Sequence, residues 1–190
     1  MSCLSNYLNY CRRLHTEIRC LICGFPVSME SGNSLIHLYY SLIHPYLTCC
    51  INVWSSTYRT NLKTLCTAKK RSVRSLFATA QQLQSRDIFI NQKILSLDKL
   101  VNQQEGILAY KVINGTFLLN DFLNHGDVRH QIQLRNIGDL RIPLYTATQS
   151  QLFVRYRCIN TWNGLSGDLR SSSSFCTFKN KLRQLYLSLT

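Results

Sequence analysis

The sequence predicts a mainly α-helical protein with a small antiparallel β ribbon near its C-terminal end, and three observations support this fold class. Apolar residues recur at helical spacing through residues 35–54 and again through residues 60–77. A third helical pattern occupies residues 98–114. In contrast, the segments 140–144 and 151–159 alternate apolar and polar residues, as paired strands do.

The stretch from Leu35 to Trp54 contains no Lys, Arg, Asp or Glu, which predicts a buried helix. Pro45 should kink or divide this helix, because proline has no backbone N–H to donate and its ring crowds the preceding turn. The side chains expected to have structural roles here are Tyr39, Tyr40, Pro45, Tyr46 and Trp54. The stretch approaches the roughly 20 residues of a membrane span, but its histidines and hydroxyl groups argue against a membrane partner.

Residues 60–77 have the pattern of a basic amphipathic helix. One side of this helix is apolar and consists of Leu62, Leu65, Val73 and Leu76. Lys63, Lys70 and Arg74 fall on an adjacent stripe. We therefore expect one face of the helix to pack and the neighbouring face to be positively charged.

The chain as a whole divides into four segments of different character. We expect a divergent N-terminal segment at 1–33, a helical region at 34–115, a variable connector at 116–140, and a ribbon followed by a basic helix at 141–190. In the helical region, a short helix over residues 88–95 and a turn at Ser96, Leu97 and Asp98 precede the third helix. Gly115 should end that helix, because glycine tolerates the left-handed conformation at a helix end.

The C-terminal region combines the predicted ribbon with a final helix. Trp162 should cover the ribbon. The final helix is predicted from Phe175 to Leu189. Its inward-facing residues are expected to be Phe178, Leu182, Leu185 and Leu189, with lysines and an arginine outside.

The formal net charge is +13, and the excess is concentrated in two blocks. Residues 34–80 contain six basic residues and no acidic one, whereas residues 141–190 contain seven basic residues and one acidic residue, Asp168. Basic blocks attract polyanions, because Lys and Arg that neutralise phosphates release counterions. The alternative interpretation is a solvated basic surface that maintains solubility.

Nine cysteines are present without regular spacing, and no apolar signal peptide precedes them. We therefore expect reduced cysteines in an intracellular protein, with nucleus and cytoplasm both open. Cys20 and Cys23 form a lone Cys-x-x-Cys, and the nearest further cysteines are Cys49 and Cys50. A structural zinc site needs four ligands at compatible spacing, so neither a metal nor another cofactor is expected.

Three motifs follow one another along the chain. The first motif begins with LYYSLIHPYL at 38–47 and continues with Trp54, TNLKTL at 60–65 and KKRSVR at 69–74. The second is RYRCINTWNGL at 155–165, and the third is FKNKLRQLYL at 178–187. In this order they resemble the region in and beyond the thumb, downstream of the polymerase palm, of non-LTR (LINE-type) retrotransposon reverse transcriptases. The resemblance covers most of residues 34–190, although Gly164 and Ser166 stand where that family usually has serine and proline.

The resemblance implies a thumb-like helical bundle whose basic face holds the backbone of a template and primer duplex. The expected partner is RNA or an RNA/DNA duplex, bound with low sequence specificity. The residues expected to contact its phosphates are Arg59, Lys63, Lys69, Lys70, Arg71 and Arg74, followed by Arg155, Arg157, Lys179, Lys181 and Arg183.

Catalytic chemistry is not apparent in this chain. Reverse transcriptases hold two magnesium ions with closely placed aspartates of the palm, whereas the aspartates here are isolated from one another. No glycine-rich phosphate loop, nucleophile elbow or metalloprotease helix occurs either. We therefore expect a truncated region that is not an enzyme on its own, with magnesium required only by a full-length parent that carries palm and fingers.

Two further hypotheses belong to different functional classes. The first is a non-functional open reading frame derived from the element, whose product folds poorly; cooperative unfolding would argue against it. The second is a protein-interaction module that uses the aromatic helix 35–54 as its partner surface or for self-association. A defined oligomer in solution would favour this second hypothesis.

Overall fold

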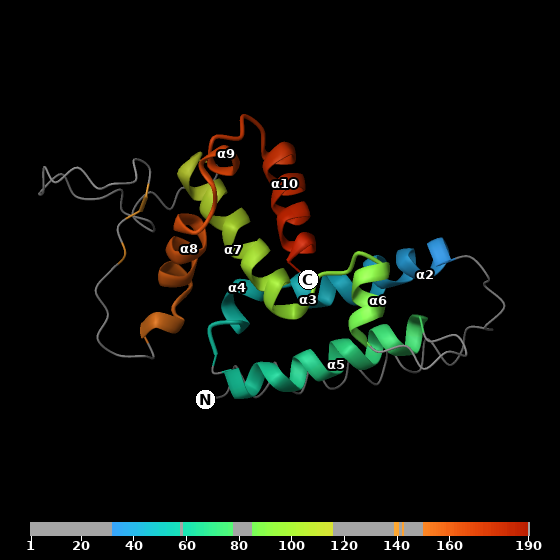
Figure 1. The fold of residues 1–190 in the computed structure, drawn as a ribbon. Coiled ribbons are helices and arrows are strands. Elements are labelled where there is room, and N and C mark those ends of the chain that lie inside the picture. The colour runs from blue at the N-terminus through green and yellow to red at the C-terminus, as the bar shows by residue number, and fades with distance from the viewer. Residues whose placement is uncertain are drawn as a thin grey trace, which may run out of the picture. The chain divides into compact units, whose positions relative to one another are not determined.

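In the computed structural model the chain forms two compact units, residues 1–97 and residues 98–189. Figure 1 shows the helices of the chain, coloured by residue number. The residues that the structure describes are 32–57, 59–77, 85–115, 139–140, 142 and 150–189. Within these residues the elements are helices, which confirms the mainly α-helical fold class, and no strand is present among them. The segment 1–33 and the connector 116–140 lie almost entirely outside the described residues.

The predicted helix 35–54 is divided into several short helices in the first unit. They are α2 (Gly32–Leu38), the π-helical turn η1 (Tyr39–Ile43), α3 (His44–Thr48) and α4 (Ile51–Trp54). In η1 the His44 N–H donates to the Tyr39 carbonyl five residues earlier, and Pro45 follows in the first turn of α3, where a missing N–H is tolerated. Just before Pro45 the helix changes from a π-helical to an α-helical hydrogen-bond pattern while its backbone stays right-handed. It is interrupted at Cys49 and Cys50, which was not expected.

One face of these short helices is buried and includes Tyr39, Ile43, Leu47, Ile51 and Trp54. The Trp54 Nε1–H also donates to the Cys49 carbonyl at 3.0 Å, so the indole satisfies a backbone acceptor at the end of α3. The prediction of a core position is wrong for Tyr46, which is 38% exposed, and Pro45 is also at the surface. Tyr40 is half-buried. The buried residues Tyr39, Ile43 and Leu47 follow one another at four-residue intervals, whereas Tyr46 is rotated by about 100° from Leu47 and so lies outside this face.

The first unit continues with α5 (Arg59–Phe77) and α6 (Ser85–Asn91). The predicted short helix therefore starts three residues earlier than expected. It ends in a turn at Lys93, which has a φ of +50°, with the Ile94 N–H donating to Phe89 O at 2.9 Å and the Lys93 N–H donating to Ile90 O at 3.1 Å. This is the hydrogen-bond pattern of a Schellman motif, in which Lys93 occupies the position that usually holds glycine.

The second unit contains one long helix and a group of shorter ones. They are α7 (Leu97–Ile113), the 3₁₀ turn η2 (Ser150–Leu152), α8 (Val154–Asn163), α9 (Gly167–Arg170) and α10 (Phe175–Ser188). The predicted end of α7 is confirmed, since Gly115 has a φ of +68°. The final helix is also confirmed, because α10 covers nearly the range predicted for it.

The predicted β ribbon is wrong at residues 151–159, because most of this segment belongs to α8. Its alternation was a coincidence of sequence, and the buried side chains of α8 follow a helical spacing instead: Cys158, Ile159 and Trp162. Trp162 is therefore a core residue of a helix rather than a cover for strands. Most of the other predicted strand, 140–144, lies outside the described residues.

Phe178 of α10 is the centre of the second unit's core. Its ring stacks on Tyr110 of α7 with a centroid distance of 4.3 Å, and the Trp162 ring lies 6.1 Å away. Gly106 of α7 allows close approach of α10, because a Cβ there would meet Cδ2 of the buried Leu182 at 3.0 Å. On α10 the third buried position is Tyr186, whereas Leu185 is half-buried and Leu189 is exposed, which corrects the predicted inward face.

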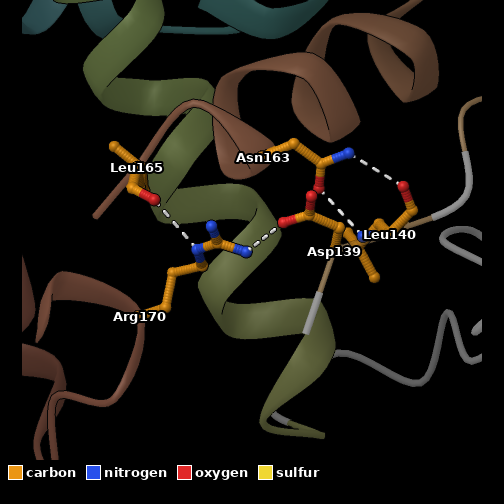
Figure 2. Close-up of polar contacts among 5 residues, drawn as sticks. All are labelled: Asp139, Leu140, Asn163, Leu165 and Arg170. Atoms are coloured by element: carbon orange, nitrogen blue, oxygen red, sulfur yellow. Dashed lines mark hydrogen bonds and ion pairs between the residues drawn. The ribbon is translucent and has the colours of Figure 1, made fainter. Parts of the chain in front are cut away.

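Asp139 and Leu140 precede the C-terminal helices in the chain, and polar contacts attach them to α8 and α9 (Figure 2). The Asn163 side chain accepts from Leu140 N–H at 2.9 Å and donates to Leu140 O at 2.8 Å. The Arg170 guanidinium donates to Leu165 O at 2.9 Å and pairs with Asp139 at 2.6 Å. Asn163 therefore completes the backbone hydrogen bonds of Leu140 as a neighbouring strand would.

Candidate nucleic-acid interface

Among the side chains of α5 that the structure describes, the basic ones exposed to solvent are Lys63, Lys70, Arg71 and Arg74. At about 100° per residue, Lys63, Lys70 and Arg74 lie within an arc of roughly 40°, and Arg71 lies about 60° beyond its edge. We call these four residues the α5 basic row. The opposite side of the helix is buried and includes Leu65, Val73 and Leu76, as the sequence predicted.

The α5 basic row has no acidic partner among the residues that the structure describes. Helix α5 contains no Asp or Glu along its 19 residues. Within the described part of the chain, no carboxylate lies within ion-pair distance of any of the four basic side chains. With a rise of about 1.5 Å per residue, the row extends roughly 16 Å from Lys63 to Arg74. It therefore forms an extended positive strip on a rigid helix.

Lys69 does not belong to this strip, and its predicted phosphate contact is wrong. Its side chain is only 3% exposed. The ammonium donates to Leu95 O at 2.6 Å and lies 5.7 Å from the centroid of the Phe89 ring. Since Lys69 follows Lys63 by six residues, it is rotated about 240° around the helix, onto the packed side. Its role is to join α5 to the loop after α6.

The same substitution should affect stability at Lys69 but hardly at the adjacent Lys70. Lys69→Met keeps an apolar stem but leaves Leu95 O without its donor, so we expect a loss of about 1–3 kcal/mol in the free energy of unfolding. Lys70→Met should change stability by less than about 0.5 kcal/mol. Urea denaturation of both variants measures this difference, and equal losses would contradict the assignment.

The basic residues of the second unit are less well arranged for binding. Lys179 and Lys181 of α10 are exposed, and Arg183 is half-buried. Lys179 and Arg183 share one flank of the helix, whereas Lys181 is on the other flank, about 160–200° away. This unit offers scattered charges, in contrast to the continuous row on α5. The side chain of Arg59, at the start of α5, lies outside the described residues.

Arg157 is an internal ion-pair residue, so its predicted phosphate contact is also wrong. Its guanidinium pairs with Glu105 of α7, whose side chain is 3% exposed. The other oxygen of Glu105 accepts from the Thr161 hydroxyl at 2.8 Å. Arg155, which was also expected to contact phosphates, is half-buried, and because it lies two residues before Arg157 on a helix the two side chains point in different directions.

Burial shapes the chemistry of the groups around this ion pair. It lowers the pKa of Arg157, an effect that the neighbouring Cys158 partly opposes. It also raises the pKa of Cys158 to about 12, so this thiol stays protonated and unreactive at neutral pH. Glu105 was not identified from sequence, because a lone acidic residue in a helix gives no sign of its burial. The cluster is structural and holds α7 against α8.

No group of three or more His, Cys, Asp or Glu side chains in the part of the chain that the structure describes is placed to hold a metal ion. None of the helices in the same part is both long enough and apolar enough to cross a membrane. Comparisons of the chain with protein families, curated proteins and solved structures give no match.

Proposed function

We propose that this chain binds the backbone of RNA or of an RNA/DNA duplex through the α5 basic row, without preference for base sequence. The observation that carries the proposal is the row itself: Lys63, Lys70, Arg71 and Arg74 lie exposed and unpaired by described carboxylates on an acid-free helix. Lys and Arg at such positions neutralise phosphates and release counterions. The exposed hydroxyls of Thr60 and Thr64 are suitable as additional phosphate donors.

The exposed face of α5 also favours nucleic-acid binding without sequence specificity. Base recognition needs side chains that enter a groove or stack on unpaired bases. The exposed face of α5 carries lysine, arginine, threonine and serine, and no aromatic residue. Such a surface contacts phosphates, which position a protein on a duplex but carry no sequence information. In this proposal the chain corresponds to the thumb and downstream region of a LINE-type reverse transcriptase and does not polymerise on its own.

The test is a titration of a fluorescently labelled RNA/DNA hybrid with the purified chain over a series of salt concentrations. Each phosphate contact contributes about 0.7–0.9 to the slope of log affinity against log salt concentration. We expect the triple substitution Lys70→Ala, Arg71→Ala and Arg74→Ala to weaken binding and to lower the magnitude of that slope by about 2–3. Circular dichroism of wild type and variant establishes that both are equally folded.

A charge-conserving variant is the matched control for this titration. Lys70→Arg, Arg71→Lys and Arg74→Lys change the same side chains but keep every positive charge, so the slope should stay at the wild-type value. If the alanine and charge-conserving variants gave the same slope, the basic row would not be the phosphate contact. Failure of the folded wild-type chain to bind the hybrid at low salt would contradict the whole proposal.

A further inference from the structure

Cys49 and Cys50, in the first unit, present two neighbouring thiols on the protein surface. Both side chains are exposed, and their Sγ atoms are 4.0 Å apart. The other described cysteines are the half-buried Cys66, the buried Cys158 and the exposed Cys176. Adjacent position, exposure and sulfur separation together distinguish the Cys49–Cys50 pair as a surface dithiol.

The backbone of the pair is strained and firmly held. Cys49 has φ −59° and ψ 121°, and Cys50 has φ 50° and ψ 27°, close to the central residues of a type II turn. The second of these positions favours glycine, so a cysteine there is strained, and retained strain is a feature of ligand sites. Trp54 fixes the turn by donating from Nε1 to Cys49 O at 3.0 Å and from its backbone N–H to Cys50 O at 3.1 Å.

Oxidation of this pair to an ordinary disulfide is unfavourable. Adjacent Cα atoms are about 3.8 Å apart across a trans peptide, whereas disulfides usually join Cα atoms that are about 4.4–6.8 Å apart. Chelation has no such conflict. Two thiolates at about 2.3 Å from a tetrahedral metal ion are roughly 3.8 Å apart, close to the 4.0 Å observed between the sulfurs.

We propose that Cys49 and Cys50 form a two-thiolate site for a thiophilic cation, either a soft metal ion or a trivalent arsenical, whose remaining positions stay open to solvent or an external ligand. Soft centres of this kind prefer thiolate ligands. Binding replaces the two thiol protons, so affinity should increase with pH.

Phenylarsine oxide is a suitable probe, because it joins two neighbouring thiols without any change of oxidation state. Two As–S bonds replace the As–O bond, and the oxygen leaves as water with both thiol protons. Cys20 and Cys23 offer a competing Cys-x-x-Cys, so the full chain is used with Cys20→Ser and Cys23→Ser. After reduction, intact mass should show one adduct that resists excess glutathione and is released by dithiothreitol.

Substitutions of the pair give the decisive comparison. In that background, Cys49→Ser or Cys50→Ser should abolish the adduct, whereas Cys176→Ser should retain it. Cys50→Gly should also abolish the adduct while raising the melting temperature, since glycine relieves the left-handed strain. This result separates loss of the thiol from loss of the fold. An adduct that survives Cys49→Ser and Cys50→Ser, or its absence from the background chain, would overturn the proposal.

Alkylation of the wild-type chain provides a test that needs no variant. Peptide mapping after iodoacetamide treatment compares samples with and without phenylarsine oxide. Cys49 and Cys50 should be protected by the arsenical, and the exposed Cys176 should be alkylated equally in both samples. If Cys49 and Cys50 were alkylated at the same rate with and without the probe, the site would not exist.

Discussion

Arg157→Ala is expected to lower the free energy of unfolding of the second unit by about 3–5 kcal/mol. The substitution removes the charged partner of Glu105, whose side chain is 3% exposed. The Thr161 hydroxyl would still donate to the Glu105 carboxylate. A buried carboxylate without its counter-charge keeps the full cost of its lost hydration. Urea denaturation followed by Trp162 fluorescence, in a Trp54→Phe background, measures this unit specifically.

Two comparisons separate this effect from general damage to the helix. Arg170→Ala breaks the ion pair with Asp139, in which both side chains are about one-fifth exposed, and should cost only about 1 kcal/mol. Replacing both buried charges, with Glu105→Leu and Arg157→Met, should restore much of the stability lost in Arg157→Ala. Equal losses for Arg157→Ala and Arg170→Ala would show that burial of Glu105 does not decide the energetics.

Phe178→Ala is expected to cost about 3–5 kcal/mol, because its fully buried ring is the common neighbour of Tyr110 and Trp162. The cavity would open at the contact between α7, α8 and α10, and those helices have little freedom to collapse into it. The same Trp162 fluorescence assay measures the change. An emission shift to longer wavelength in the native variant would report water near the indole.

Phe175→Ala is the matched control on the same helix. Phe175 lies three residues earlier and is 36% exposed; its ring centroid is 6.1 Å from that of Tyr110 and 5.1 Å from the Lys111 ammonium. We expect its removal to cost about 1 kcal/mol. If the two phenylalanine variants were equally destabilised, the core of the second unit would not be centred on Phe178.

Helical periodicity correctly predicted the helices that bury one face and expose the other. Val73 and Leu76 of α5, and Phe178 and Leu182 of α10, are buried where their spacing placed them. The pattern failed at residues 151–159, because a short run of alternating residues satisfies both a strand and a helix, and only packing decides between them. The left-handed break at Cys50 was also missed, since cysteine gives no local turn signal.

For the proposed interface, the sequence predicted the basic helix α5 but not which of its side chains are exposed. Lys69 and Lys70 contribute equally to the net charge of the helix. Because consecutive residues are rotated by about 100° around a helix, Lys69 is buried and Lys70 is exposed. Arg157 was misassigned for a different reason: its partner, Glu105, is 52 residues away in the chain. Such long-range pairing depends on tertiary structure, which local pattern does not reveal.

Binding through the α5 basic row can be measured by lysine footprinting on α5 with and without a bound RNA/DNA hybrid, using brief acetylation and peptide mass spectrometry. Lys63 and Lys70 should be acetylated in the free chain and protected in the complex, because their ammonium groups contact phosphates. Lys69 should react slowly in both states, since it is buried. Unchanged acetylation of Lys63 and Lys70 in a saturated complex would show that the nucleic acid does not bind through the α5 basic row.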